Sequence, residues 1–345
     1  MDRKKTNFEE SLKSFNFTYR TNVSLRQITK RNRAGSCRFF FKPETEEELK
    51  HLICLLDSTN TKFLILGDCS NVYLLDNSLF EVIISTKGVK QIEITNDSVT
   101  CSCGYNLNKL SRYCVNNGIS GYEGFLGIPG TVGGATVNNS GAYTSVMEKV
   151  VKSVSVYTPL KGIHTLSNSE LEFSHRNSIF KTKKDTSIIL SVTFDTSKKA
   201  DLNELRTIAD SIVLKRRTSI DSDKHSLGSI FISDSYKHFR KKHAIRLIVK
   251  KILYKFYSIL HKNYKDKKRA NKTLEFYFLG MSKFAPHCDT LNRFCWDKET
   301  PEAIFLEYLN LLYNLSENTL LIEIEIKGQA NSIKKLIPFY QNNQS

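Results

Sequence analysis

The chain has 345 residues and a formal net charge of +16 at neutral pH. Its hydrophobic content of 40% and charged content of 25% are those of a globular protein, which excludes a disordered or fibrous chain. The N-terminal sequence is polar and no long apolar run follows it, so we expect neither a secretory leader nor a membrane span, and we place the protein in the cytoplasm. A chain of this length is expected to form two or three domains.

Strand and helix patterns both occur in the first two hundred residues. Thr45 and Glu48 form a capping box at the start of one helix, and Asp201 with Glu204 opens another. Gly118 stands where the C-terminus of a helix favours glycine. In chain order, we predict a helix at 45–58, strands at 63–66, 72–75 and 98–104, a helix at 106–116, strands at 150–157 and 187–194, a helix from 201 with a buried face of Leu205, Ile208, Ala209, Ile212 and Val213, and a last strand at 320–327.

The eight cysteines do not have the spacing of a zinc-binding motif. A chain of this length also has no need of a disulfide framework. Cys101 and Cys103 are two residues apart in a predicted strand, so their side chains are expected on one face. We therefore predict reduced structural thiols and no metal site.

The segment from Gly121 to Tyr143 is the most informative part of the sequence. Five of the chain's 16 glycines fall between positions 127 and 141, and bare backbone there can approach a ligand closely. Such a loop presents N–H groups to an anion, for which a pyrophosphate is the expected ligand. A pair of tight hairpin turns would explain the glycines, but not Ile128-Pro129-Gly130 or Asn138-Asn139-Ser140. We therefore favour a cofactor-binding loop.

Basic residues concentrate between Lys237 and Lys272, where fourteen Lys or Arg residues face one acidic residue, Asp266. Apolar residues recur at helical spacing between them, at Ile245, Ile248, Val249, Ile252, Phe256, Ile259 and Leu260. A helix of this kind can lie on an anionic membrane or contact nucleic acid. We favour a helix of a C-terminal domain whose lysines are solvated, and a phosphate-rich substrate would also be attracted by its field.

Several motifs resemble those of one enzyme family in the same order. Residues 121–143 are similar, almost position by position, to the glycine-rich loop of the UDP-N-acetylenolpyruvoylglucosamine reductases (MurB). The resemblance covers about residues 20–233, with a last patch at 320–328. Its other motifs are an opening strand and turn at 22–29, Gly35 and 39–43, a first phosphate turn at 66–67 and 70–71, an arginine motif at 176–181, a serine motif at 215–217 and 226–231, and a glutamate strand at 320–328.

The resemblance implies an α+β protein. Its N-terminal part would be a two-subdomain FAD-binding fold of the vanillyl-alcohol-oxidase type, with subdomains at 1–85 and 86–214, and a divergent, basic substrate domain would follow at 215–345. NADPH would reduce the FAD, and hydride would then reach UDP-N-acetylglucosamine enolpyruvate to give UDP-N-acetylmuramate for peptidoglycan synthesis. The expected partner is this UDP-sugar, with no obligatory nucleic acid, no membrane span and a monomeric state.

The resemblance also implies three catalytic residues. Ser229 would protonate the enol that hydride transfer leaves, while Arg176 and Glu323 would stabilise charge on the substrate carboxylate. A guanidinium suits an enolate-like oxyanion, and the carbanion needs a positioned proton donor. Glu325 lies two residues further on, but its distance to Gly328 does not fit the family register, so Glu323 is the predicted residue.

Two further groups of residues follow from the same resemblance. Arg217 and Ser233 are expected to contact substrate. The residues expected to bind the cofactor are Gly67, Ser70, Asn71, Gly127, Ile128, Pro129, Gly130, Thr131, Gly133, Gly134, Asn138 and Gly141.

The sequence departs from the family pattern at several of these motifs. Cys69 replaces a glycine of the first phosphate turn and Ala34 replaces the first glycine of a pair, so we expect strained backbone or less space for a pyrophosphate. His175 stands in place of a tyrosine, and Ile232-Ser233 in place of Lys-Asn. An alternative function is therefore a catalytically impaired FAD-fold protein that binds an anionic partner through residues 237–272. An oxidase is less favoured, since no covalent flavin attachment site is recognisable.

Overall fold

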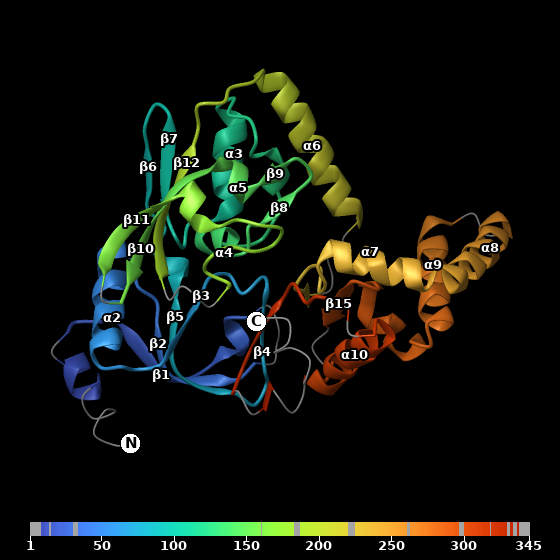
Figure 1. Cartoon of the computed structure of the whole chain (residues 1–345), viewed down its shortest axis with the longest axis horizontal. Helices are drawn as coiled ribbons and strands as arrows, with labels where there is room; N and C mark the ends of the chain where they lie inside the picture. Colours follow the sequence, from blue (N-terminus) through green and yellow to red (C-terminus); the bar gives the residue numbers. More distant parts are fainter. Residues whose placement is uncertain are drawn as a thin grey trace. The chain divides into compact units, whose positions relative to one another are not determined.

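The computed structural model describes residues 8–13, 15–29, 34–159, 161–182, 187–219, 225–260, 263–296, 300–317, 319–329, 332–333 and 337. The chain divides into two compact units (Figure 1). The division into three domains that the sequence suggests stays a prediction. Unit 1 consists of Met1–Thr29, Gly35–Ser70 and Leu79–Ser219, and unit 2 consists of Lys30–Ala34, Asn71–Ser78 and Ile220–Ser345.

The first sheet of unit 1 has four strands, in the order β1 (Tyr19–Ser24), β2 (Ser36–Phe41), β5 (Leu79–Ser85) and β3 (Phe63–Leu66). Strands β1 and β2 are antiparallel, whereas β2, β5 and β3 run parallel to one another. Parallel strands need a crossover connection, and helix α2 (Glu46–Ser58) lies between β2 and β3 in the chain.

Helix α2 confirms the predicted helix and its cap. The hydroxyl of Thr45 accepts a hydrogen bond of 3.1 Å from the N–H of Glu48. The second half of the cap differs from a standard box, because the Glu48 carboxylate accepts from the N–H of Glu44. The predicted apolar stripe is buried, and its members are Leu49, Leu52, Ile53 and Leu56.

The second sheet of unit 1 is antiparallel throughout, in the order β11 (Gly162–Ser167), β10 (Val151–Thr158), β12 (Ile188–Asp195), β7 (Ser98–Ser102) and β6 (Ile92–Ile94) (Figure 1). Three of these strands confirm strands that the sequence predicts. A single hydrophobic core joins this sheet to the first sheet and to α2. Unit 1 is therefore a mixed α and β structure around this main core, with a smaller apolar cluster of Val115, Leu126, Leu205 and Ala209.

Helices α3 (Leu107–Asn116) and α6 (Leu202–Ser219) confirm two more predictions. The side chain of Asn106 caps α3 by accepting from the N–H of Lys109, and Gly118 follows the helix with a φ of 67°. The carboxylate of Asp201 caps α6. The buried face of α6 contains Leu205, Ala209 and Ile212, but Ile208 is 39% exposed, so its predicted burial is wrong.

Four shorter elements of unit 1 lie around the glycine-rich loop. Helix α4 (Val132–Val137) is part of the loop itself. Strands β8 (Gly141–Ala142) and β9 (Ser145–Val146) form a small hairpin at its end, and the one-turn helix α5 (Met147–Val150) leads into β10. The hairpin places Tyr143 at its exposed tip.

Unit 2 has a core rich in aromatic residues. Tyr73 stacks on Phe305 with ring centroids 4.5 Å apart, and Trp296 lies 5.0 Å from the same ring. The segment Asn71–Ser78 therefore belongs to this core, although its sequence neighbours belong to unit 1. The elements of unit 2 are β4 (Val72–Leu74), β13 (His225–Ser226), α7 (Ser233–Lys242), α8 (Ala244–Leu260), α9 (Tyr264–Phe278), β14 (Cys288–Thr290), β15 (Arg293–Trp296), α10 (Glu302–Leu315) and β16 (Glu325–Lys327).

The last predicted strand is shorter than the sequence suggests. Strand β16 pairs in parallel with β4, with Ile326 opposite Tyr73. Before it, Ile322 forms a separate antiparallel bridge with Phe231. The chain bends at Ile324 because it changes partner there, so one continuous strand over 320–327 is wrong.

Helix α8 also differs from expectation. The apolar side chains at its helical spacing are exposed, with Ile245 at 81% and Phe256 at 64%, whereas Lys250 is buried. The prediction that its lysines are solvated is confirmed for Lys251 and Lys255, which are exposed, and is wrong for Lys250. Among the residues that the structure describes, no helix is long and apolar enough to cross a membrane.

Candidate functional site

Two turns that the sequence marks as phosphate-binding lie side by side in unit 1. A Cβ atom added to Gly67, which follows β3, would come within 2.6 Å of the Thr131 hydroxyl. The hydroxyl of Ser70 donates a hydrogen bond of 3.0 Å to the carbonyl of Pro129. Residues from the two turns thus meet within contact distance, as binding of one ligand by both turns would require.

Most N–H groups of the glycine-rich loop are used inside the protein. Those of Val132 and Gly133 donate to the carbonyls of Tyr105 and Cys103, and that of Gly134 donates to the Thr131 hydroxyl. The N–H groups of Gly130 and Thr131 donate to no residue that the structure describes. Of the N–H groups that the sequence predicts for anion binding, those of Gly130 and Thr131, beside Ser70, are therefore the ones left to bind a ligand.

The glycines of the loop serve different purposes. Gly130 has a φ of 138°, which side chains rarely allow. Gly133 packs so closely on Cys103 that an added Cβ would lie 2.9 Å from its carbonyl oxygen, and Gly141 is similarly crowded by Ser145. Gly134 is exposed, and an added Cβ would meet only the Thr131 hydroxyl, at 3.5 Å. Packing thus explains Gly133 and Gly141, while Gly134 has open space above it.

Burial also determines the chemistry of the neighbouring thiol. It raises the pKa of Cys103 to about 12, so this group stays a neutral thiol at physiological pH. Cys101 and Cys103 are both buried, and all eight cysteines are free thiols, as the sequence predicts. Cys103 contributes packing and a backbone acceptor to the loop rather than a nucleophile.

Cys69 occupies the first turn in a strained conformation. Its φ is 53°, in the left-handed region, and its side chain is buried at 3% exposure. A residue with a Cβ pays about 1–2 kcal/mol there relative to glycine. The expectation that this substitution demands strained backbone is confirmed, and the same expectation for Ala34 stays a prediction.

Arg176 also lies in a left-handed conformation. Its φ is 60°, and it is the third residue of a tight turn in which the N–H and carbonyl groups of Ser174 and Asn177 bond to each other. A positive φ at this position is the mark of a type II turn, which favours glycine or asparagine. Strain of this kind at an arginine is a feature of functional sites, where the surrounding structure holds it.

The end of the glycine-rich loop holds this arginine turn. The side-chain amide of Asn139 donates 2.9 Å to the carbonyl of Ser174, and the hydroxyl of Ser178 donates 2.7 Å to the carbonyl of Val137. The ammonium group of Lys181 donates to both the Asn138 side chain and the Arg176 carbonyl, each at 3.2 Å. The loop and the arginine motif are thus one hydrogen-bonded structure.

The sequence predictions missed Asn139 and Lys181 as structural parts of the site. Asn139 is 3% exposed and also accepts from the N–H of Glu148 at 3.0 Å. The run Asn138-Asn139-Ser140 was a signal for it, because buried asparagines serve as backbone partners. Lys181 stands inside the arginine motif, but nothing in its type or spacing indicates that its ammonium group bonds to the arginine's own carbonyl.

The basic residues 215–217 near the end of α6 contribute Arg216 to the site, whereas the sequence predicts Arg217. Arg216 donates 3.2 Å to the carbonyl of Gly124, and its guanidinium lies 5.4 Å from the centre of the Tyr143 ring. An added Cβ at Gly127 would lie 2.8 Å from the Arg216 Cδ. Arg217, the predicted substrate residue, is exposed on the last turn of the helix.

In unit 2, the backbone brings Ser229 and Glu323 together. The N–H of Glu323 donates 2.7 Å to the carbonyl of Ile230, and the N–H of Ile232 donates 2.9 Å to the carbonyl of Leu321. These two bonds make the antiparallel bridge between Phe231 and Ile322. The serine motif and the glutamate strand, about ninety residues apart, are therefore neighbours.

Asn71 fastens the glutamate strand from its other side. Its side-chain amide donates 3.2 Å to the carbonyl of Glu323, and its own carbonyl accepts 2.9 Å from the N–H of Glu325. Glu325 forms an ion pair of 2.8 Å with Lys327. Gly328 packs against Leu75, which an added Cβ would approach to 2.7 Å. Glu323 and Glu325 therefore have different surroundings, in keeping with their different distances from Gly328 in the sequence.

The remaining predicted residues have simple positions. Ser233 is exposed as the first residue of α7, and Ser229 is exposed two residues before the buried Phe231. Arg176 belongs to unit 1, whereas Ser229 and Glu323 belong to unit 2. The structure thus describes the three predicted catalytic residues as one residue in unit 1 and a neighbouring pair in unit 2.

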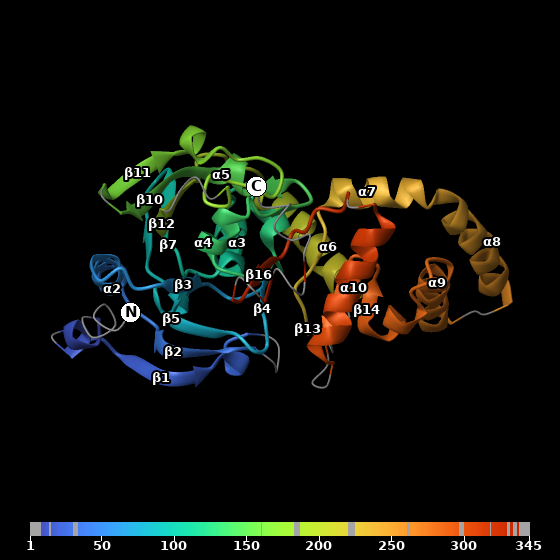
Figure 2. The ribbon, with the colours of Figure 1, turned by 60° about the horizontal axis from the view of Figure 1, so that its bottom comes forward.

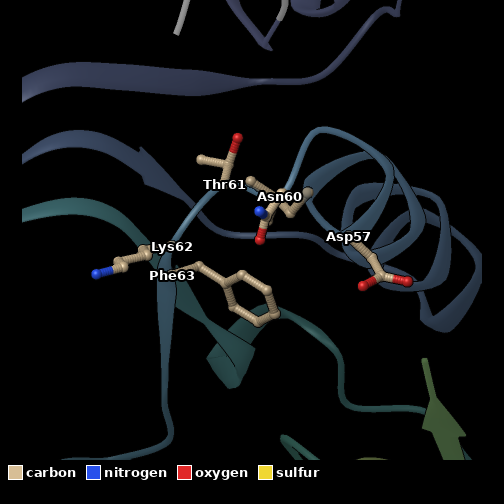
Figure 3. Close-up of a pocket in the computed structure, with 6 residues that line it drawn as sticks. Asp57, Asn60, Thr61, Lys62 and Phe63 are labelled. Atoms are coloured by element: carbon tan, nitrogen blue, oxygen red, sulfur yellow. The ribbon is translucent and has the colours of Figure 1, made fainter. Parts of the chain in front are cut away.

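One open surface pocket of about 400 Å³ lies in unit 1, away from these turns. Asp57 and Asn60 line it at the end of α2, and Lys62 and Phe63 line it at the start of β3 (Figure 3). The hydroxyl of Tyr157 donates a hydrogen bond of 2.9 Å to the Asp57 carboxylate. Because Gly67 follows the opposite end of β3 and no predicted site residue lines this pocket, it is not the candidate site.

Comparisons with known proteins point to a flavin enzyme. Residues 37–167 match a family described as an FAD binding domain. The UDP-N-acetylenolpyruvoylglucosamine reductase of Lactobacillus acidophilus is 30% identical over 221 residues, which are 64% of this chain and 73% of that protein. The reductase of the same name from Pseudothermotoga lettingae is 36% identical over 197 residues, which are 57% of this chain and 66% of that protein.

A solved structure extends the likeness in fold. The crystal structure of UDP-N-acetylenolpyruvylglucosamine reductase (MurB) from Thermus caldophilus matches with a TM-score of 0.62 and 20% sequence identity, over 90% of this chain and 99% of that one. Residues 220–345 are more than a third of this chain, so the match includes most of them. The predicted α+β fold with an FAD-binding domain is confirmed, and it includes the part whose sequence diverges.

Proposed function

Because the chain belongs to the UDP-N-acetylenolpyruvoylglucosamine reductase family, we propose that it uses FAD and NADPH to reduce UDP-N-acetylglucosamine enolpyruvate to UDP-N-acetylmuramate. The observation that carries this proposal is the 30% identity over 73% of the Lactobacillus acidophilus reductase. The reaction serves peptidoglycan synthesis, and the protein is an oxidoreductase. We further propose that it acts as a monomer in the cytoplasm.

The two turns of unit 1 fit the pyrophosphate of FAD. Gly67 and Ser70 meet the glycine-rich loop at Pro129 and Thr131, and two N–H groups there are open to an anion. Bare backbone at Gly130 and open space at Gly134 let a ligand approach closely. Held by these turns, FAD would supply the hydride, taken from NADPH, that reduces the enolpyruvyl double bond of the substrate.

Arg176 is proposed to bind the substrate carboxylate. Addition of hydride to the double bond builds negative charge on the adjoining carboxyl group, and a guanidinium with fixed donors stabilises such an oxyanion. Its backbone is held by Lys181 and by the turn that Asn139 anchors, so the point from which the guanidinium extends is fixed. Arg217 and Ser233 are proposed to contact the rest of the substrate.

Ser229 and Glu323 are proposed to complete the reaction. The enol that hydride addition leaves needs one proton at carbon, and the Ser229 hydroxyl is the proposed donor. A hydroxyl is a weak acid, so it needs polar neighbours. Glu323 is held beside the serine motif by the Ile230 carbonyl, and its carboxyl group, when protonated, donates a hydrogen bond to the substrate carboxylate.

Turnover with purified protein tests this function. The protein is expected to show a flavin spectrum and to oxidise NADPH only when the enolpyruvyl substrate is added, with UDP-N-acetylmuramate as product. Ser229→Ala and Glu323→Gln should each lower kcat by roughly a hundredfold or more, since they remove groups that act in the transition state. Glu325→Gln, two residues away, is the matched control and should keep full activity.

Two results would reject the function. Bound flavin without substrate-dependent NADPH oxidation would keep the fold but remove the activity. Equal loss in the Glu323 and Glu325 variants would show that the strand, not the carboxyl group, matters. The alternative of a catalytically impaired protein gains no support from the comparisons.

A further inference from the structure

Helix α8 exposes the face that an amphipathic helix normally buries. Among the described residues, eighteen large apolar side chains are exposed, and eight of them lie on this helix. They share one side of it, because their spacing repeats at three and four residues. These eight are Ile245, Ile248, Val249, Ile252, Leu253, Phe256, Ile259 and Leu260.

The opposite side of α8 packs within unit 2. Leu247 and Lys250 are buried there, and Tyr254 and Tyr257 are half-buried. Helices α8 and α9 contact each other, and α7 leads into α8 (Figure 2). The side that contacts the rest of the unit is therefore the more polar side of this helix.

An ion-pair cluster fixes this orientation. The ammonium group of Lys250 lies 3.2 Å from the Glu275 carboxylate of α9, and Arg240 of α7 bonds to the same carboxylate. Lys250 is only 5% exposed. Turning α8 to bury its isoleucines would separate Lys250 from Glu275. The Glu275 carboxylate, whose side chain is 14% exposed, would then keep only Arg240 of these two cations, which costs free energy. The exposed apolar side is thus a consequence of the cluster.

Positive charge borders the apolar side. At 100° per residue, Lys251 and Lys255 fall along one edge and Arg246 along the other. Helix α8 has no acidic residue, and the segment 237–272 has fourteen basic residues against one acidic residue. An apolar stripe between rows of lysine and arginine is the pattern of a helix that lies in a membrane interface.

We propose that the apolar side of α8, defined by the eight residues above, binds an anionic lipid surface. Apolar side chains would enter the acyl boundary while Arg246, Lys251 and Lys255 contact lipid phosphates. A second copy of the chain would bring the same positive charge against itself. Nucleic acid would neutralise the lysines but would leave the apolar side chains in water. The proposal is independent of the catalytic function.

Vesicle sedimentation with the full-length protein tests the proposal. Binding to mixed phosphatidylglycerol and phosphatidylcholine vesicles should be at least about tenfold tighter than binding to phosphatidylcholine alone, and should weaken with salt. The double variant Ile252→Ser with Phe256→Ser should bind the mixed anionic vesicles with an affinity at least about tenfold lower than that of the unmodified protein. The control, Ile94→Ser with Leu214→Ser, changes exposed apolar residues outside α8 and should bind like the unmodified protein.

A fluorescent reporter locates the contact. The single tryptophan, Trp296, is buried at 3% exposure, so Phe256→Trp adds the one exposed indole. Its emission should shift to the blue when anionic vesicles are added, whereas that of Leu214→Trp should not. Both variants must melt at the temperature of the unmodified protein.

Several outcomes would overturn the proposal. These are failure to bind anionic vesicles, unchanged binding by the Ile252→Ser, Phe256→Ser variant, and no shift for Phe256→Trp. A vesicle-free dimer that this double variant abolishes would instead assign the surface to a second copy. Binding of a DNA oligonucleotide in place of vesicles would assign it to nucleic acid.

Discussion

The side-chain amide of Asn139 donates a hydrogen bond of 2.9 Å to the backbone carbonyl of Ser174, and so connects the glycine-rich loop to the turn that carries Arg176. The same asparagine accepts from the N–H of Glu148 at 3.0 Å. It is almost completely buried, so neither bond is replaced easily by water. Asn139 is therefore one of the residues that hold the proposed carboxylate-binding arginine against the cofactor loop.

Asn139→Ala should weaken both stability and catalysis. The Ser174 carbonyl and the Glu148 N–H lose their part-buried partner, which costs about 0.5–1.5 kcal/mol each in the free energy of unfolding. The Arg176 turn is released, so kcat should fall more than flavin affinity. Denaturant unfolding and steady-state kinetics measure the two effects. Asn117→Ala removes an exposed side-chain bond in α3 and is the control; equal effects for both variants would refute the role of Asn139.

Substitutions at Cys69 should show the strain in the first phosphate turn. At a φ of 53°, glycine is favoured over alanine by about 1 kcal/mol, which reverses their usual order in a folded protein. Cys69→Gly should therefore be more stable than Cys69→Ala. Both variants lack the thiol, so the comparison isolates the backbone strain. Comparison of their unfolding midpoints tests this. The idea fails if the alanine variant is the more stable of the two.

Two neighbouring glycines should respond differently to alanine. Gly134→Ala adds a methyl group in open space within α4 and should leave the apoprotein unchanged or up to about 1 kcal/mol more stable. Its affinity for FAD should fall if the cofactor occupies that space. Gly133→Ala strikes Cys103 and should destabilise the apoprotein itself. Calorimetry and flavin titration separate the two cases, and unchanged FAD affinity in the Gly134 variant would place the ligand elsewhere.

Stability should fall at alkaline pH because buried thiols resist ionisation. Burial raises the pKa of Cys37 to about 11 and that of Cys101 to about 12, from an ordinary value of 9.0. As pH rises, the unfolded chain releases these protons before the folded protein does. The contribution of the thiols to the free energy of unfolding is therefore fully present below pH 9 and is lost as pH rises toward their pKa values in the folded protein. Each thiol contributes about 1.4 kcal/mol per pH unit to the slope.

A cysteine variant checks this pH dependence. Cys101→Ala should reduce the slope of unfolding free energy between about pH 9 and pH 11 by one thiol's share, although it also lowers stability at every pH by leaving a cavity. Cys54→Ala, at an exposed thiol, should leave the slope as it is. Identical slopes for all three proteins would contradict the proposed titration.

Local patterns predicted much of the fold. Helix caps and apolar stripes located α2, α3 and α6, and alternation located β7, β10 and β12, because those signals depend on neighbours in sequence. Tertiary contacts decided the rest. Tyr73 joins a core made mostly of residues after 220, and the chain at Ile324 changes its strand partner. Neither contact can be predicted from the residues next to it in the sequence.

The same distinction applies to the candidate site. The family resemblance identified the loop, the arginine turn and the serine and glutamate motifs, and the backbone places Ser229 near Glu323. It did not reveal the supporting roles of Asn139 and Lys181, which depend on distant backbone carbonyls. Helix α8 shows the opposite failure: its periodicity was clear, but the Lys250 and Glu275 pair decides which side faces inward.

The central claim is that hydride passes from bound flavin to the enolpyruvyl double bond. The most direct measurement is anaerobic: the flavin of the purified protein is reduced with NADPH, and UDP-N-acetylglucosamine enolpyruvate is then added without oxygen. We predict that the absorption of oxidised flavin returns, one substrate is consumed for each flavin, and UDP-N-acetylmuramate appears. Flavin that stays reduced in the presence of this substrate would contradict the account.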